Sequence, residues 1–164
     1  MTQLKVYVST FGKYNAGILF GQWMNLNDYS SKEEFLAAAR DLHYDEENPE
    51  LFFQESENLP MYVLTETSID WRYVEVFNDI DESKIDALNA FVDAFDGREL
   101  DTFEQRYLGQ AESREDYAIQ HVEEHGLLND VPENVARYFD YDAYARDLFI
   151  NNLVFKNGYI FSNQ

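Results

Sequence analysis

Negative charge runs along the whole of this 164-residue chain. The sequence has 32 Asp and Glu residues against 12 Lys and Arg, a formal net charge of −20. Residues 1–60 carry ten acids and four bases, residues 61–110 carry twelve and four, and residues 111–164 carry ten and four. Because 45% of the residues are hydrophobic, the chain can build a core, and a disordered acidic tail is excluded. The fold must therefore present many carboxylates at its surface despite their mutual repulsion.

This charge and the missing cysteines exclude several classes of function. Like charges repel, so we expect no direct binding to nucleic acid or to an anionic membrane. The absence of cysteine excludes disulfides, zinc–thiolate sites and thiol nucleophiles. No run approaches 18 apolar residues, and the N-terminus lacks a long apolar segment of the signal-peptide kind. We therefore expect a cytoplasmic protein.

The pattern of residues 1–60 predicts a small α+β unit with an antiparallel sheet and one helix. Ser31, followed by Glu34, has the spacing of a capping box and marks the helix start. The expected strands are rich in β-branched and aromatic residues, and turn chemistry separates the first two. We expect strands at 4–10, 18–24 and 51–55, a loop at 11–15, and an acidic turn at 45–50.

Residues 61–110 predict an acidic helical unit, and residues 111–164 a second α+β unit. The expected helices run from Thr67-Ser68 to Asp79, from Asp81 to Gly97, over 100–108, over 112–125, from Pro132 to Tyr138, and over 140–149. Asn157-Gly158 lies between two short apolar runs, which is typical of a hairpin with a type I′ turn. The predicted fold class is therefore α+β, with three small units at 1–60, 61–110 and 111–164.

A metal site is one alternative for the segment 112–148, which holds ten acids and three arginines. His121, Glu124 and His125 match H-x-x-E-H, in which two imidazoles on one helix face bind zinc and the glutamate acts as a base. The motif is short, and no third ligand stands out among so many carboxylates. Histidines at a helix C-terminus also suit its dipole. We therefore assign no metal.

No other segment carries a specific catalytic signature. The sequence lacks G-x-S-x-G, P-loop and G-x-G-x-x-G motifs. Its acidic clusters do not match the EF-hand spacing. With 32 acids, any fold places some carboxylate pair at glycosidase distance, so such pairs carry no information. We expect no enzyme activity and no cofactor.

Aromatic residues gather near the C-terminal end of the same segment. Base stacking needs basic neighbours, which this stretch lacks, so core packing or a subunit interface explains it better. We expect a dimer interface that contains Tyr138, Phe139, Tyr141 and Tyr144.

The total charge is comparable with that of a short DNA duplex. Duplex DNA carries one charge per ~1.7 Å of axis. Two copies of a chain with a net charge of −20 would match about 70 Å of duplex, or roughly 20 base pairs. An acidic dimer could therefore imitate a DNA segment electrostatically, although most acidic proteins are simply soluble.

Motifs at both ends of the chain resemble the ArdA antirestriction family. The N-terminal residues that carry this resemblance are Val6-Tyr7-Val8, Gly12-Lys13-Tyr14-Asn15, Gly17, Gly21 and Trp23. The C-terminal ones are Tyr117-Ala118, Glu123-Glu124, Gly126, Val131-Pro132, Tyr138, Asp140-Tyr141, Ala143-Tyr144 and Ala145-Arg146-Asp147-Leu148. The middle, 61–110, resembles the family only in being acidic and helical. His125 and the H-x-x-E-H match lie outside the recognised pattern.

The resemblance implies an elongated homodimer that imitates bent B-form DNA. It implies joining through the C-terminal unit, and binding to the specificity and modification subunits of type I restriction–modification enzymes in place of DNA. It also implies a gene carried by a mobile genetic element. We expect the partner to contact a set of exposed acids. These are Asp45, Glu46, Glu47, Asp79, Asp81, Glu82, Asp86, Glu112, Glu115, Asp116, Glu123 and Glu124. The alternative is an acidic adaptor for another basic DNA-binding protein.

Overall fold

A computed structural model describes residues 2–164, which form two compact units that divide between Asp101 and Thr102. Each unit combines a three-stranded antiparallel sheet with helices, so the predicted α+β class is confirmed. The first unit contains the sheet and helix expected in 1–60 together with most of the helices expected in 61–110. The finer division into three units stays a prediction. Among the described residues, no helix is long and apolar enough to cross a membrane.

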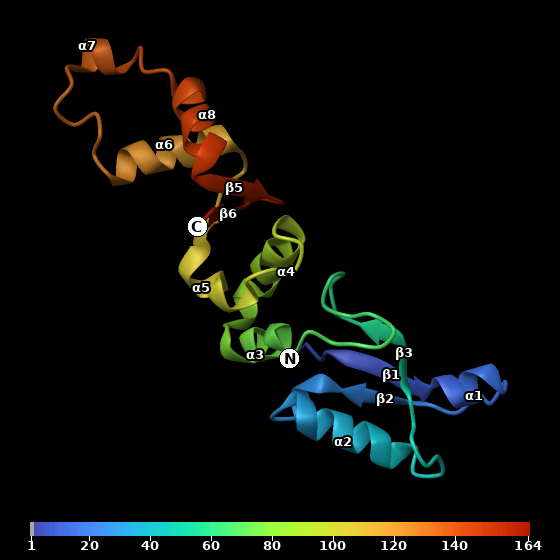
Figure 1. Cartoon of the computed structure of the whole chain (residues 1–164). Coiled ribbons are helices and arrows are strands. Elements are labelled where there is room, and N and C mark those ends of the chain that lie inside the picture. The colour runs from blue at the N-terminus through green and yellow to red at the C-terminus, as the bar shows by residue number, and fades with distance from the viewer. Residues whose placement is uncertain (1) are drawn as a thin grey trace. The chain divides into compact units, whose positions relative to one another are not determined.

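The sheet of the first unit has β1 (Lys5–Thr10) at its centre, between β2 (Gln22–Asn25) and β3 (Leu51–Glu57) (Figure 1). Side chains alternate between the faces of a strand, and Val6 and Val8 of β1 are buried. Helix α2 (Lys32–Leu42) supplies Phe35, whose ring centroid lies 6.2 Å from that of Phe53. One face of the sheet therefore forms the core of this unit.

Two expectations for the first 30 residues were wrong. The segment Phe11–Asn15 forms a short helix, α1, because Thr10 caps it and its hydroxyl accepts a hydrogen bond from the Lys13 N–H at 3.1 Å. The strand expected over 18–24 begins only at Gln22, because residues 16–21 form a loop. A short 3₁₀ turn, η1 (Leu26–Asp28), follows β2. At Phe11–Asn15, the Thr10 cap thus outweighed turn propensity.

Helix α2 begins as predicted, after Ser31. The Ser31 hydroxyl accepts a hydrogen bond from the Glu34 N–H at 3.1 Å. The Glu34 carboxylate accepts from the Ser30 N–H at 2.9 Å, so the reciprocal half of the capping box is displaced by one residue.

After β3 and an irregular segment at 58–70, the first unit continues with α3 (Trp71–Asp79), η2 (Glu82–Lys84) and α4 (Ile85–Ala94). The cap expected at Thr67-Ser68 was wrong, because Asp70 caps α3 and its carboxylate accepts from the Arg72 N–H at 3.2 Å. Gly97 has φ +72° and donates its N–H to Val92 O at 2.8 Å, so it ends α4 as expected. The Trp71 ring stacks on Phe35 with centroids 5.8 Å apart, which joins these helices to the core of the sheet.

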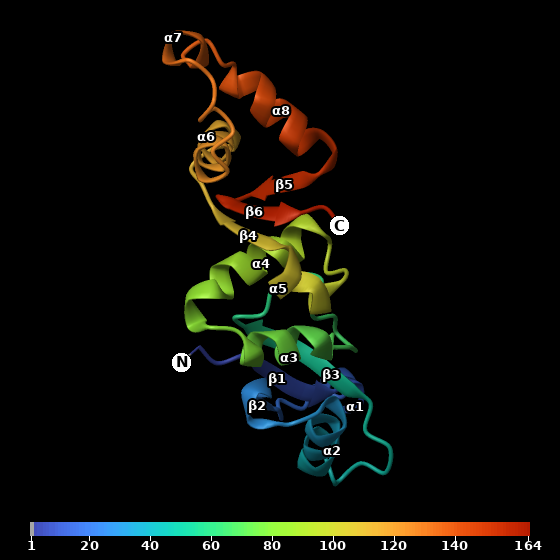
Figure 2. The same cartoon turned by 90° about the vertical axis from the view of Figure 1, so that its left-hand side faces the viewer.

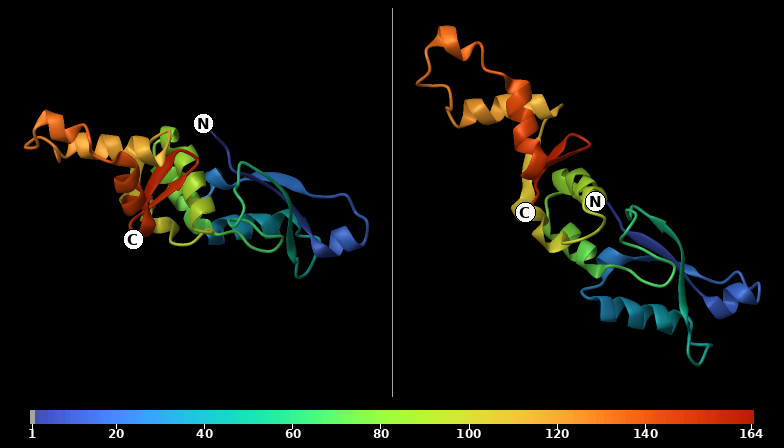
Figure 3. Two further views of the ribbon diagram at one scale, coloured as in Figure 1. Left: turned by 90° about the horizontal axis from the view of Figure 1, so that it is seen from above. Right: turned by 45° about the horizontal axis from the view of Figure 1, so that its top comes forward.

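The second unit pairs three strands in the order β4 (Tyr107–Gln110), β6 (Tyr159–Ser162) and β5 (Leu153–Lys156), and it packs two helices beside them (Figures 1 and 2). Between β4 and β5 come α6 (Arg114–Glu124), α7 (Glu133–Ala136) and α8 (Tyr141–Asn151). Helices α6 and α8 lie side by side (Figure 3). They bury small and β-branched side chains, Ala118 and Val122 of α6 and Ala145 of α8. Their exposed residues include five acids but also Arg114, Arg146 and Ile150.

The C-terminal hairpin was predicted correctly. Strands β5 (Leu153–Lys156) and β6 (Tyr159–Ser162) are joined by Asn157 and Gly158, both at positive φ, +53° and +87°. The helix expected over 100–108 was only half right. It is η3 (Leu100–Thr102) and α5 (Phe103–Arg106), followed by strand β4 (Tyr107–Gln110). Pairing with β6, 50 residues away in sequence, decides the strand.

Candidate functional site

The acidic residues face solvent almost without exception. All 32 are exposed except Glu46, Asp70 and Asp116, which are half-buried. The two buried basic side chains are Lys13 and Arg106. The surface therefore has a larger share of acidic residues than the sequence has, because two basic side chains are buried and no acidic side chain is.

The twelve acids expected to meet a partner lie in both units. Ten of them are exposed, and Glu46 and Asp116 are half-buried. Seven, from Asp45 to Asp86, belong to the first unit, and five, from Glu112 to Glu124, to the second. Exposure is necessary for a contact, but contact itself stays a prediction.

Backbone hydrogen bonds at helix starts fix some of these carboxylates. The Asp81 carboxylate accepts from the Ser83 N–H at 2.9 Å and from the Ser83 hydroxyl at 2.6 Å. Those hydrogen bonds lower the pKa of Asp81, so it stays ionised. In the second unit the Ser113 hydroxyl caps α6 and places Glu115 and Asp116 in its first turn, where negative charge suits the helix dipole.

Helix α6 presents acids along one side. Asp116 and Glu123 are seven residues apart, which is two turns and about 10.5 Å of axial rise. Glu112 lies just before the helix, and lines an open hollow with Asp116 and Gln120. The acidic side of α6 thus comprises Asp116 and Glu123, and Glu112 of the preceding segment adjoins Asp116 in the hollow.

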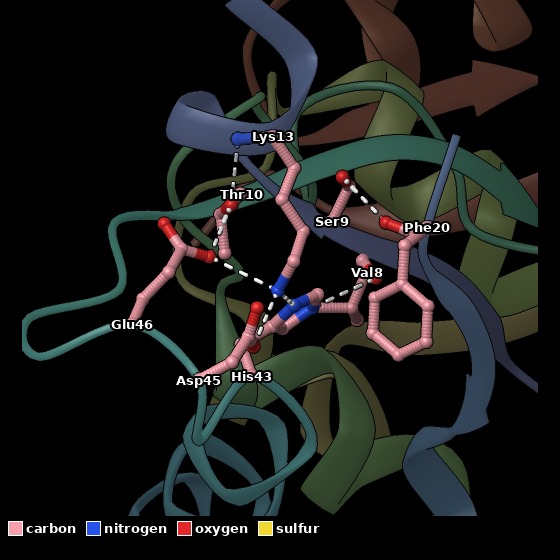
Figure 4. A network of polar contacts seen from close by, with 8 residues as sticks. All are labelled: Val8, Ser9, Thr10, Lys13, Phe20, His43, Asp45 and Glu46. Atoms are coloured by element: carbon pink, nitrogen blue, oxygen red, sulfur yellow. Dashed lines mark hydrogen bonds and ion pairs between the residues drawn. The ribbon is translucent and has the colours of Figure 1, made fainter. Parts of the chain in front are cut away.

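Around Lys13 the structure gathers a polar cluster that sequence reasoning missed (Figure 4). The Lys13 ammonium lies 2.8 Å from Asp45 Oδ1, 3.1 Å from Glu46 Oε2 and 2.8 Å from His43 Nδ1. The Glu46 carboxylate also accepts from the Thr10 hydroxyl at 2.7 Å. Lys13 is 6% exposed, so one buried cation holds two acids of the predicted surface. These residues are 30 or more positions from Lys13, and no local pattern connects them.

Charge compensation sets the protonation states in this cluster. Burial alone would lower the pKa of Lys13, but hydrogen bonds to Asp45 and Glu46 outweigh it and raise that pKa. The Lys13 hydrogen bond lowers the pKa of Asp45, and the Thr10 hydroxyl, then Lys13, lower the pKa of Glu46. Burial, followed by the charge of Lys13, lowers the pKa of His43. Neutral His43 accepts from Lys13 through Nδ1 and donates through Nε2 to Val8 O at 3.3 Å.

Three side chains of this cluster also have the spacing of metal ligands. The ligand atoms of His43, Asp45 and Glu46 all lie within 4.8 Å of one another, the grouping that a metal ion would need. The Lys13 ammonium lies within hydrogen-bond distance of all three side chains. A positive charge of the chain itself thus fills the place between them.

His121, Glu124 and His125 do not assemble the zinc site that their spacing suggested. The two imidazole centroids are 4.2 Å apart, but His125 Nδ1 lies 2.9 Å from the His121 carbonyl at the end of α6. Within residues 2–164, these side chains do not form a group of three metal-ligand atoms. His121 instead packs near Tyr117 and Tyr144, and burial with the nearby His125 lowers its pKa.

The four aromatic residues of the expected dimer interface divide into two kinds. Phe139 lies 4.9 Å from Tyr141 and 5.5 Å from Tyr144, centroid to centroid, so these three pack among themselves. Tyr138 is 76% exposed, and the Arg137 guanidinium lies 5.2 Å from its ring centroid. The interface itself stays a prediction, with Tyr138 as its most available side chain.

The fold and surface define a class: a small α+β protein whose folded surface presents fixed carboxylates. Within that class, the chain belongs to the ArdA family. The family described as antirestriction protein (ArdA) matches residues 6–161, nearly the whole chain, which confirms the resemblance. Family membership therefore implies an antirestriction function. The family is not a known enzyme family. Comparison with curated proteins finds no match.

Proposed function

We propose that this chain is a mimic of B-form DNA that inhibits type I restriction–modification enzymes. Its acidic surface occupies the DNA-binding groove and blocks both restriction and modification. The observation that carries this proposal is the exposure of all but three of the 32 acids on a folded chain. Family membership adds the antirestriction role.

The physical basis is the attraction between a basic groove and fixed negative charge. A DNA-binding groove is lined with lysine and arginine, and its affinity for DNA comes largely from neutralising phosphates. Carboxylates held by a folded backbone offer the same groove a comparable charge. Electrostatic steering then speeds association and makes it sensitive to salt.

The same chemistry predicts breadth of inhibition. Base specificity is read through donors, acceptors and the thymine methyl in the major groove, and carboxylates do not reproduce that pattern. The chain therefore inhibits type I enzymes whatever DNA sequence each recognises. Within this proposal it binds the modification and specificity subunits as a homodimer, in the cytoplasm, and protects DNA arriving with a mobile genetic element.

Competition for DNA tests the proposal. A type I methyltransferase is titrated with a fluorescent duplex that contains its recognition site, with and without the purified chain. The expected result is displacement of the duplex at stoichiometric chain, and weaker displacement as salt rises. Equal DNA binding with and without the chain overturns the proposal. If a nucleoid protein captures the chain and the methyltransferase does not, the acidic adaptor replaces it.

A further inference from the structure

An exposed apolar patch interrupts the acidic surface of the first unit. Five large apolar side chains within ten residues face solvent: Tyr14, Ile18, Leu19, Phe20 and Trp23, with Leu19 99% exposed. Single exposed apolar residues are ordinary on protein surfaces, but a contiguous group marks an interaction site. We call these five residues the 14–23 patch. They line a hollow of 340 Å³ together with Glu55 and side chains of β1.

The 14–23 patch continues onto the sheet face opposite the buried Val6 and Val8. In the strand register, Trp23 of β2 pairs with Tyr7 of β1, and Tyr7 pairs with Glu55 of β3. The Trp23 and Tyr7 rings meet edge to face with centroids 5.6 Å apart. An indole, a phenol and a carboxylate therefore lie in one row across the sheet.

The loop that presents Leu19 is held in place from several sides. The Ile18 N–H donates to Lys13 O at 2.9 Å, and the Ser9 hydroxyl donates to Phe20 O at 3.0 Å. The Phe20 ring lies edge-on to His43 at 5.4 Å and 4.9 Å from the Lys13 ammonium. A preformed loop loses little conformational entropy on binding, so burial of its apolar area contributes to affinity with little offset.

Glycine is required at position 21 for the same arrangement. A Cβ on Gly21 would lie 2.6 Å from Tyr7 Cε1 and 2.9 Å from Val8 O. The chain therefore passes close over β1, directly before Trp23. This close approach fixes the course of the loop relative to the aromatic row.

The charges beside the 14–23 patch select a cationic partner. The Glu55 carboxylate is exposed and lines the hollow, whereas Asp45 is already paired with the Lys13 ammonium that lies over Phe20. An arginine side chain matches this chemistry, because its guanidinium stacks on aromatic rings and pairs with a carboxylate while its stem covers apolar surface. Arginine and aromatic residues are also enriched in protein interfaces.

We infer that the 14–23 patch is an anchor that docks an arginine of a basic protein surface, with Trp23 and Tyr7 under the guanidinium and Glu55 as its counter-ion. This inference rests on the proposed function, since that basic surface is the DNA-binding face of the restriction–modification enzyme. DNA offers no such apolar contact, so the anchor gives the chain affinity that charge imitation alone lacks. The apolar part of this affinity does not depend on salt, whereas the Glu55 ion pair does.

The test compares Leu19→Ser with Met61→Ser in the full chain. Both side chains are highly exposed, 99% and 78%, and Met61 lies outside the hollow. Affinity for a type I methyltransferase is measured at several salt concentrations. We expect Leu19→Ser to weaken binding about 10-fold at every salt concentration, without changing the slope of log K against log salt, and Met61→Ser to leave it unchanged. Equal affinities of both variants and the wild type overturn the inference.

A second readout locates the contact directly. The chain has two tryptophans, Trp23 in the patch and the buried Trp71. With 5-fluorotryptophan in both positions, the methyltransferase should shift the ¹⁹F resonance of Trp23 and leave that of Trp71. Glu55→Gln should reduce the salt slope by roughly one. An unmoved Trp23 signal with a bound enzyme refutes the anchor but keeps the proposed function.

Two further outcomes distinguish failure of the proposed function from failure of the arginine anchor. If the wild type does not bind the methyltransferase at all, the proposed function and the anchor fall together. If Leu19→Ser abolishes self-association in sedimentation, a second copy occupies the patch, and the assignment to a basic partner is wrong.

Discussion

Lys13 shows how a single residue can support the acidic surface. Its buried ammonium holds Asp45 and Glu46 at 2.8 and 3.1 Å. Lys13→Met should lower the free energy of unfolding by about 1–2 kcal/mol, because two carboxylates and His43 lose their hydrogen-bond donor. Urea unfolding measures the change. This expected loss of stability is smaller than for a fully buried ion pair, because the Asp45 side chain is 58% exposed and can be rehydrated.

The matched control for Lys13 is Lys5. Its ammonium lies 3.8 Å from Glu57 in an exposed pair, 37% and 53% exposed. Lys5→Met removes the same charge and should change stability by less than about 0.5 kcal/mol. Equal losses in the two variants would show that the hydrogen bonds of Lys13 contribute no more stability than an exposed ion pair.

His43 gives the molecule a pH dependence of predictable sign. Its pKa in the folded chain lies below the ordinary value of 6.5, because of burial and the charge of Lys13. Between these two pKa values the unfolded chain binds more protons, so stability rises with pH and is fully present above about 6.5. We expect the free energy of unfolding to fall as pH drops below that point, and His43→Gln to flatten this dependence.

The comparison in that experiment is one of slopes rather than of absolute stabilities. His121 also has a lowered pKa, so part of the dependence should persist in His43→Gln. The carboxylates of Asp45 and Glu46, with lowered pKa values, act in a separate window below their ordinary values of 3.8 and 4.5. If the slope of the free energy of unfolding against pH near pH 6 is the same in His43→Gln as in the wild type, a group other than His43 is responsible for it.

At the scale of elements, the caps decide where helices carry their acids. The Ser113 hydroxyl accepts from the Asp116 N–H at 3.1 Å and begins α6. Ser113→Ala should cost about 1 kcal/mol of stability, because one N–H of the first turn loses its acceptor. Ser113→Asp keeps an acceptor and should restore most of it. Thermal unfolding followed by circular dichroism measures both, and equal melting of Ser113→Ala and wild type would contradict the cap.

Elements with strong local signals were predictable from sequence, and those that depend on distant partners were not. Ser31, Gly97 and Asn157-Gly158 each fix the backbone through nearby atoms, and their helix start, helix stop and hairpin were correct. Strand β4 was missed because only its pairing with β6 defines it. A short segment such as 107–110 has too little periodicity to show its class.

The candidate site likewise has features that the sequence predicts and features that it does not. Ten of the twelve acids expected at the surface are exposed, since charged side chains are rarely buried without a partner, and their contact with a partner stays a prediction. The Lys13–His43–Asp45–Glu46 cluster was missed because the fold, not a motif, brings it together. The exposed apolar loop was misread as a strand, since Ile18, Leu19 and Phe20 have the composition of a buried one.

At the scale of the whole molecule, self-association depends on which aromatic side chains are free. Tyr141 and Tyr144 pack with Phe139 inside their own unit, so charged substitutions there would also disturb folding. Tyr138 is 76% exposed, and we expect Tyr138→Glu to yield monomers in sedimentation velocity if the dimer forms at this segment. Tyr44→Glu, at an 86% exposed tyrosine of the first unit, is the control. A dimer in both variants would move the interface elsewhere.

The arrangement of charge, and not its total, should determine inhibition. Asp79, Glu82 and Asp86 belong to the predicted contact surface, whereas Asp28, Glu33 and Asp41 do not, and all six are exposed. Changing either trio to amides removes three negative charges and leaves the side-chain volumes nearly unchanged. If the first trio meets the basic groove, its amide variant should compete less well for a type I methyltransferase. Its slope of log K against log salt should fall by roughly one per lost contact, while the second trio keeps the wild-type slope. Equal losses from the two trios would mean that net charge alone attracts the enzyme, and the imitation of a DNA duplex by placed carboxylates would then be wrong.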